Sequence, residues 1–457
     1  MTYRFNISRL FLFVLLLAGC EKNDSTTIVS GSRVVDKTTL LATISGEGQS
    51  PSVPPSLGMG LHVPPAPSIQ LIFSKHGGGV AYSAEINDKS YVVHNGRAGK
   101  QYDAVGAIAL SPDGRRIAYG ALDAGKWRMV ADNIEGAAFS TVKSPLFSPD
   151  GNHLAYQALS GEKWYLVVDT TPNPGTNKRF LDHQFSGDSR HIAYIDDADE
   201  KNRGRLVISD LAFARQAIIT SGAIGMTMNR SGSRIAAITV RDNRQHIVEC
   251  SFDRPDAIKT GPTYTEIHDP AFAPDGFALA YGAERDGRRI LVFNDREEIL
   301  PVGGSLVEPP VVRPDQKGVG SIISLNNQAT FHQFFSDEGK VERSYDEANG
   351  LIYSSDGSAH AYAARKDNNW FVVVNGVDGA SFDRVISPKF SPNGKYLVYR
   401  ARKDGKRFVV VAKKTGKIIR QHPSYEQVFD VEFTADGKSV AYGVKDGQQL
   451  VWRVESL

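Results

Sequence analysis

The sequence of 457 residues is poor in cysteine, with only Cys20 and Cys250. Two cysteines exclude both the disulfide framework of a small secreted domain and a zinc site built from thiolates. Cys250 ends an alternating apolar run at residues 246–250, which predicts a half-buried strand residue. A reactive or intermolecularly bonded thiol is the alternative.

An excess of charge of either sign is also missing. The 53 lysines and arginines, less Arg4 and Arg9 in a segment expected to be removed, equal the 51 aspartates and glutamates. Nucleic-acid-binding proteins concentrate positive charge in a patch or stripe, and no such run occurs here. The balance therefore argues against DNA and RNA as partners.

Motifs for catalysis and for cofactor binding are absent as well. There is no H-E-x-x-H sequence and no G-x-S-x-G nucleophile elbow. The triplet Gly437-Lys438-Ser439 is no phosphate-binding loop, because Glu432 stands where that motif requires its first glycine. We therefore expect no enzyme activity, no cofactor and no metal.

Two polar clusters still deserve a prediction. His183 and His191 lie near Asp182 and Asp188, and solvent-facing turn residues are favoured over a metal site. The acidic segment at residues 196–200 lacks the spacing and the glycine of an EF-hand loop. A solvated hairpin tip is therefore favoured there over a calcium site.

Long apolar runs are missing too, because the longest one, LFLFVLLL at residues 10–17, is far too short to span a bilayer. It follows Arg4 and Arg9, as in a signal peptide. The next residues, ending in Ala18-Gly19-Cys20, resemble the lipobox of bacterial lipoproteins. The resemblance implies removal of residues 1–19 and acylation of Cys20, for instance with palmitate. An ordinary signal peptide is the alternative.

The same resemblance bears on location. Glu21 stands where an aspartate would imply retention at the inner membrane, so it implies a lipid anchor in the outer membrane of the cell envelope. Several acyl chains anchor a protein stably. Residues 20–67 are rich in Ser, Thr and Gly, with six prolines between positions 51 and 67. This composition predicts a lipidated, flexible tether.

What is present is a repeat. Phe147-Ser148-Pro149-Asp150-Gly151 recurs almost unchanged at 390–394, and variants follow along the rest of the chain. The positions equivalent to the aspartate are 76, 113, 150, 188, 231, 275, 315, 356, 393 and 436. Ten units at spacings of 37 to 44 residues predict a repeat architecture.

Each unit has the composition of a small antiparallel sheet. Ser-Pro-Asp-Gly favours a tight turn, and an apolar-Ala-Tyr strand follows, as at residues 117–119. A charged turn and a β-branched or aromatic run complete the unit. Trp127, Trp164 and Trp370 recur at one position, which favours a role in packing over ligand stacking.

The repeat resembles the propeller blades of the TolB family and its WD-type relatives, over residues 68–457. The resemblance implies an all-β propeller, and the ten units predict about ten blades, in one large ring, in two five-bladed rings meeting near residue 260 or in an unequal pair of rings. The seventh unit, residues 297–335, has lost its glycine and its Ala-Tyr strand.

Two functions remain open at this point. The favoured one is a membrane-anchored scaffold or assembly factor that binds an envelope protein through the propeller. The alternative is an envelope enzyme or receptor that binds a glycan, peptide or small ligand in the channel. The alternative predicts polar side chains with perturbed pKa values at one channel mouth.

Overall fold

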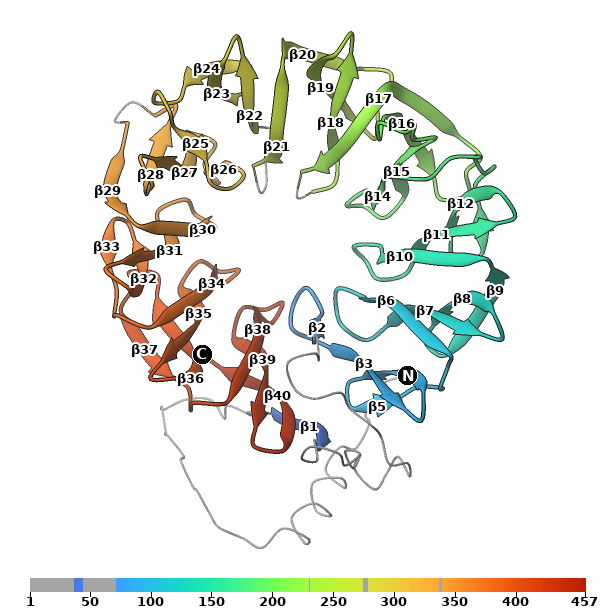
Figure 1. The fold of residues 1–457 in the computed structure, drawn as a ribbon, viewed down its shortest axis with the longest axis horizontal. Helices are drawn as coiled ribbons and strands as arrows, with labels where there is room; N and C mark the ends of the chain where they lie inside the picture. The colour runs from blue at the N-terminus through green and yellow to red at the C-terminus, as the bar shows by residue number, and fades with distance from the viewer. Residues whose placement is uncertain (1–36, 44–70, 230, 274–277, 337–338) are drawn as a thin grey trace, which may run out of the picture. The chain divides into compact units, whose positions relative to one another are not determined.

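A computed structural model describes residues 37–43, 71–229, 231–273, 278–336 and 339–457 of the chain. The predicted signal peptide, Cys20 and most of the predicted tether lie outside these residues. Residues 36–457 belong to one compact unit, and its sheets follow one another around a single ring (Figure 1). The described residues contain no helix long and apolar enough to cross a bilayer.

The strands of blades 1 to 5 are as follows. Blades 1 to 3 comprise β2 Ile72–Phe73, β3 Val80–Ile86, β4 Lys89–His94 and β5 Arg97–Ala98; β6 Ala104–Leu110, β7 Ile117–Asp123, β8 Lys126–Ala131 and β9 Ile134–Phe139; and β10 Thr141–Phe147, β11 Leu154–Ser160, β12 Lys163–Val168 and β13 Thr171–Pro172. Blades 4 and 5 comprise β14 Asp182–Phe185, β15 His191–Asp196, β16 Gly204–Asp210, β17 Gln216–Met228, β18 Arg234–Arg241, β19 Arg244–Ser251 and β20 Lys259–Tyr264.

Blades 6 to 10 complete the ring. Blades 6 and 7 comprise β21 Glu266–Phe272, β22 Leu279–Arg285, β23 Arg288–Phe293 and β24 Arg296–Ile299; and β25 Ser305–Leu306, β26 Val311–Val312, β27 Val319–Leu325, β28 Gln328–Phe334 and β29 Val341–Tyr345. Blades 8 to 10 comprise β30 Glu347–Tyr353, β31 His360–Lys366, β32 Asn369–Val374 and β33 Val377–Asp378; β34 Arg384–Phe390, β35 Tyr396–Lys403, β36 Lys406–Lys413 and β37 Ile418–Gln421; and β38 Gln427–Phe433, β39 Ser439–Asp446, β40 Gln449–Ser456 and β1 Lys37–Thr43.

The described strands form nine antiparallel sheets, and these make ten blades. The difference arises because one seven-stranded sheet, β14 to β20, contains blades 4 and 5. Its long strand β17 is the outer strand of the one and the inner strand of the other. The predicted ten-blade propeller is confirmed, and of the arrangements considered, the blades adopt the single ring (Figure 1).

The turn between the first and second strand of a blade follows from the repeated motif. The hydroxyl of Ser111 donates to Asp113 over 2.6 Å and accepts the amide of Arg116 over 2.9 Å. Gly114 closes the turn with a φ of 70°, a conformation that favours glycine. The same Ser-to-Asp bond recurs at Ser186 and Ser354. These turns border the central opening of the ring (Figure 1).

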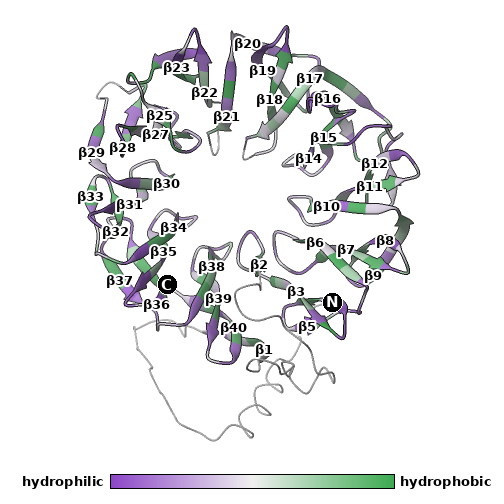
Figure 2. Ribbon diagram, in the orientation of Figure 1, coloured by the Kyte–Doolittle hydropathy of each residue, from purple (hydrophilic) through white to green (hydrophobic). Residues whose placement is uncertain are grey.

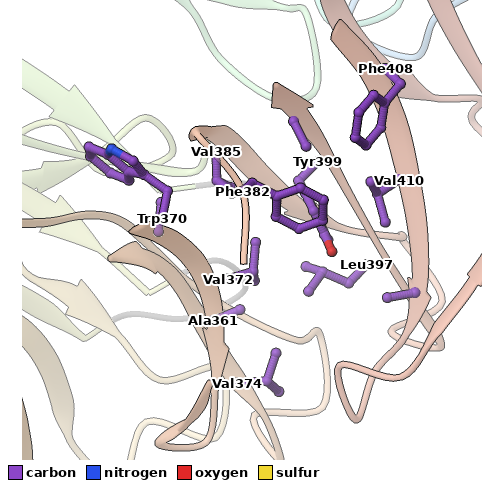
Figure 3. Close-up of a cluster of buried hydrophobic side chains, with 13 residues drawn as sticks. Ala361, Trp370, Val372, Val374, Phe382, Val385, Leu397, Tyr399, Phe408 and Val410 are labelled. Carbon is purple, nitrogen blue, oxygen red and sulfur yellow. The ribbon is translucent and has the colours of Figure 1, made fainter. Parts of the chain in front are cut away.

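Neighbouring blades are held together by apolar faces (Figure 2). Between blades 8 and 9, a buried cluster includes Trp370, Phe382, Leu397 and Tyr399 (Figure 3). The aromatic residue at the outer end of one blade packs edge-on against the tyrosine of the next, as Phe382 does on Tyr399 with ring centroids 6.0 Å apart. Because one blade cannot cover both of its faces, stacking supplies the core.

The repeated tryptophans belong to these interfaces. Trp370 is buried in the cluster between blades 8 and 9, and Trp127 and Trp164 are partly buried against equivalent clusters. Their predicted role in packing is confirmed.

The ring closes through a strand from the beginning of the chain. β1 pairs antiparallel with β40 and becomes the outer strand of blade 10. Leu41 on β1 is 1% exposed within a cluster that joins blades 10 and 1, and its carbonyl accepts the hydroxyl of Tyr82 over 3.1 Å. The predicted flexible tether over residues 20–67 is therefore wrong at Lys37–Thr43, where pairing with β40 and burial of Leu41 offset the cost of ordering.

Candidate binding site at the centre of the ring

A cavity of about 290 Å³ lies among turns that border the central opening of the ring. It is lined by residues of blades 1, 7, 8, 9 and 10: Lys75, His76, Pro314, Tyr353, Ser355, Lys389, Phe390, Ser391, Pro392, Glu432 and Phe433. We call it the central cavity. Because five blades contribute to its wall, the cavity depends on the ring and belongs to no single repeat.

Lys389 is the best-connected charged group of the central cavity. It follows a bulge in β34, where the register with β35 shifts between Ile386 and Lys389, and bulges redirect side chains. Its ammonium lies 3.3 Å from a carboxylate oxygen of Asp430, donates to the carbonyl of Val431 over 3.0 Å, and pairs with Glu432. Lys389 thus joins blade 9 to blade 10 at the ring centre.

Glu432 is less acidic than a free glutamate. Burial raises its pKa, although the hydrogen bond and the charge of Lys389 act in the opposite direction. The charged form of Glu432 is therefore sustained by Lys389, and a ligand that displaced the lysine would favour proton uptake.

Tyr353 lines the same cavity and also carries a buried polar atom. Its hydroxyl has no hydrogen-bond partner among the described residues, and burial raises its pKa. The hydroxyl fits because position 320, on the neighbouring blade 7, is glycine: a Cβ there would lie 2.4 Å from it. An unpaired buried hydroxyl costs free energy, and this one lies at the interface of blades 7 and 8, where Arg313 and Asp315 act on it.

The seventh blade departs from the repeat as the sequence predicts. Its inner strand is split into β25 and β26, which both pair with β27. Glu308, in the segment between them, accepts the amide of Gly350 in blade 8 over 2.6 Å. Blade 7 thus contributes Pro314 to the wall of the central cavity, while Glu308 and Gly320 contact blade 8.

The predictions for the two cysteines and for His183 and His191 have different outcomes. Cys20 lies outside the described residues. Cys250 lies on β19, as predicted, but is 3% exposed, and burial raises its pKa to about 12. The predicted turn location of His183 and His191 is wrong, because they lie on β14 and β15. His183 is buried between blades 3 and 4, and burial lowers its pKa to about 4.

The acidic segment at 196–200 is engaged with basic residues. Asp196 lies 2.9 Å from Arg205, and Asp199 lies 2.9 Å from Arg203. Asp196 is buried, so the predicted solvated tip is wrong at this residue. Within the described ranges, no three His, Cys, Asp or Glu side chains gather as a metal site would require.

Sequence reasoning did not find the central cavity. Lys389 and Glu432 stand in ordinary strand positions, and Tyr353 replaces the phenylalanine of the motif by one hydroxyl. The sequence does contain one signal. Blade 7 has Gly320 and Ser321 where the repeat has Ala-Tyr, and the next unit, blade 8, has Tyr353 where the motif has phenylalanine.

No family model and no curated protein matches the chain. Among solved structures, a eukaryotic initiation factor aligns over 77% of this chain and 97% of its own, with 12% identity and a TM-score of 0.50. TolB from Acinetobacter baumannii aligns over 70% and 81%, with 15% identity and a TM-score of 0.27. The β-propeller domain of the Trilobed protease from Pyrococcus furiosus aligns over 61% and 95%, with 12% identity and a TM-score of 0.35.

These likenesses concern the fold alone. The chain is a β-propeller, as the TolB-like repeat predicts, and identities this low carry no information on ligand or activity.

Proposed function

We propose that this protein is a non-catalytic scaffold of the bacterial cell envelope, anchored by lipid on Cys20, whose propeller binds a partner protein at the central cavity. One observation carries the proposal: five blades contribute to a cavity whose wall holds the charges of Lys389 and Glu432 and the side chain of Tyr353. Loops displayed on a rigid scaffold are common binding surfaces.

The charge pairing at the cavity supports binding over catalysis. Lys389 pairs with both Asp430 and Glu432, so none of these three groups is a free nucleophile or base. A partner that inserts a polar side chain between the flanking Pro314 and Pro392 meets the ammonium of Lys389 and the carboxylate of Glu432. A cavity of about 290 Å³ accommodates one or two side chains of a docked loop.

The anchor and the location rest on the lipobox-like segment ending at Cys20 and on Glu21. An outer-membrane anchor would hold the ring near other envelope proteins and raise their effective concentration. Membrane fractionation tests this part separately, because Cys20→Ala would release the protein into the soluble fraction.

Photocrosslinking from the cavity tests the docking site. A photoreactive amino acid replaces Ser355 or Pro392, two exposed residues of the cavity wall, and Glu162 on the outer hairpin of blade 3 serves as the matched control. In native envelopes we expect one discrete adduct from positions 355 and 392 and none from 162. No adduct from either cavity position, or the same adduct from position 162, contradicts the proposal.

The second candidate is a receptor or an enzyme that takes a glycan, peptide or small ligand into the same cavity. The raised pKa of Glu432 favours it, since this is the perturbed group that the alternative requires. Binding of a peptide or glycan pool to the purified protein, lost in Lys389→Met, would support this candidate over the scaffold.

A further inference from the structure

A second cavity, of about 520 Å³, lies between blades 9 and 10 at the ends of the strands away from the central turns. It is lined by Arg384, Ile386, Arg400, Ala401, Arg402, Arg407, Gln427 and Val428. We call it the arginine cavity. Its size falls within the range of small-molecule sites.

Three of its arginines form a row across neighbouring strands. Arg384 on β34 stands directly opposite Arg402 on β35, which stands directly opposite Arg407 on β36. Arg400 lies two residues from Arg402 along β35 and therefore on the same face. Like charges directly opposite each other destabilise a sheet, so the row has a cost that some other interaction must offset.

Carboxylates of the described residues do not supply that interaction. Within the described part of the chain, none of the four arginines forms an ion pair. Two neighbouring carboxylates pair with lysines instead. Asp430, whose charge acts on Arg400, pairs with Lys389, and Glu426 pairs with Lys445.

The repeat itself shows that this row is unusual. Equivalent rows are Ala104, Leu122 and Trp127 in blade 2; Thr141, Leu159 and Trp164 in blade 3; Glu266, Glu284 and Arg289 in blade 6; Glu347, Arg365 and Trp370 in blade 8; and Gln427, Lys445 and Leu450 in blade 10. None of these five rows contains more than one basic residue; blade 6 places Glu266 opposite Glu284, and Lys445 of blade 10 pairs with Glu426. In blade 8, Glu347 and Arg365 pair at 2.7 Å.

The guanidinium groups are held in place while donors remain free. Arg384 lies over the ring of Trp370, 4.0 Å from its centroid. Arg407 donates to the carbonyl of Glu426 over 2.5 Å. Arg400 makes two long bonds of 3.4 Å, to Val428 and Ser387, and its buried Nε has no partner. Since each guanidinium has five N–H donors, most donors are left for a ligand.

We infer that the arginine cavity binds a ligand through carboxylate or phosphate groups. Planar guanidinium groups bind both kinds of oxyanion in pairs of parallel hydrogen bonds. The anion would neutralise the row, satisfy the buried Nε of Arg400 and bridge blades 9 and 10. This site is separate from the central cavity and does not depend on the function proposed for it.

Calorimetric titration of the full chain tests the inference. Citrate probes carboxylate recognition, pyrophosphate probes phosphoryl recognition, and sodium chloride at equal ionic strength controls for screening. We expect one citrate or one pyrophosphate per chain. Arg384→Glu and Arg402→Gln should each weaken that binding by about tenfold or more, as expected for the loss of a charge-assisted hydrogen bond.

Two controls make the result decisive. Arg384→Glu recreates the Glu–Arg pair of blade 8, so its melting temperature without anion should equal or exceed that of the unchanged protein, which separates lost binding from misfolding. Arg288→Gln, an exposed arginine at the start of β23, should bind as the unchanged protein does. No binding of either probe, unchanged binding in both cavity variants, or an equal loss in Arg288→Gln would overturn the inference.

Discussion

At the scale of single residues, burial determines chemistry more strongly than residue type. Cys250 illustrates this, because its thiol is surrounded by the apolar cluster of blades 4 and 5. Burial raises its pKa to about 12, so the reactive thiolate is scarce at neutral pH. The sequence identified its strand but could not give its depth, which the packing of neighbouring blades determines.

Thiol labelling tests this consequence. In a Cys20→Ala chain, we expect a thiol reagent at pH 8 to leave the native protein essentially unlabelled. The same reagent should modify one thiol per chain in concentrated guanidinium chloride. Rapid labelling of the native protein would contradict the buried position of Cys250.

Glu342 is the clearest case of a buried acid held in its charged form. Burial alone would raise its pKa, but hydrogen bonds from His360, Lys340 and Tyr362 outweigh it and lower the pKa to about 2. The carboxylate lies 3.0 Å from His360 and 2.7 Å from the hydroxyl of Tyr362. Glu342 thereby links β29 of blade 7 to β31 of blade 8.

Acid denaturation tests the contribution of Glu342. Because its folded pKa lies below the unfolded value of 4.5, the stability that it contributes is complete above pH 4.5 and is lost as the pH falls toward 2. Glu342→Gln should lower the free energy of unfolding at pH 7 by about 3 kcal/mol and reduce its fall between pH 6 and pH 3.

The matched control is Glu347→Gln, which removes a more exposed carboxylate from the next blade. Its effect should stay below about 1 kcal/mol, as for surface ion pairs. Urea titrations at pH 7 give the loss in free energy of unfolding for each variant, and titrations at pH 6 and pH 3 give its fall with pH. Equal effects of the two substitutions would show that Glu342 is not the buried link described above.

At the scale of elements, the repeat predicts well what is local. The Ser-Pro-Asp-Gly turns, the Ala-Tyr strands and the charged hairpins follow from short-range chemistry, and the structure contains them. Long-range pairing was not predictable. β1 finds its partner at the far end of the sequence, and the joining of blades 4 and 5 depends on the length of β17. The arginine cavity could not be predicted either, because its row of arginines depends on the cross-strand register of β34, β35 and β36.

A single substitution on β1, the strand that closes the ring, tests its contribution to stability. Leu41→Ala should lower the free energy of unfolding by about 2–4 kcal/mol, since Leu41 fills the interface between blades 10 and 1. Thr38→Ala, on the same strand but exposed, should change it by less than about 0.5 kcal/mol. Denaturant titration of the two variants compares them; similar values would contradict the packing of β1 in the core.

At the scale of the whole molecule, stability depends on completing the ring. The number of rings could not be predicted from the sequence, because identical turns and strands occur in rings of different size. The choice is made by the faces between blades, whose packing accumulates around the circle. The continuous clusters from blade to blade, including the one that joins blades 10 and 1, explain the single ring.

Removing the last blade tests that dependence. A chain that lacks residues 427–457 exposes the buried valines of blade 9, Val398, Val409 and Val411, and deprives β1 of its partner. We expect this chain to form oligomers in size-exclusion chromatography with light scattering, because exposed apolar faces and edge strands associate. A monomer as stable as the full chain would contradict the closed ring.

The pairing of β1 with β40 also has a meaning during synthesis. β1 leaves the ribosome early and stays unpaired until β40 has been translated. An interrupted chain keeps that edge exposed however well its finished blades have folded. The pairing of β1 with β40 therefore distinguishes chains that contain β40 from chains truncated before it. Proteases that cleave unpaired segments would degrade the truncated chains first.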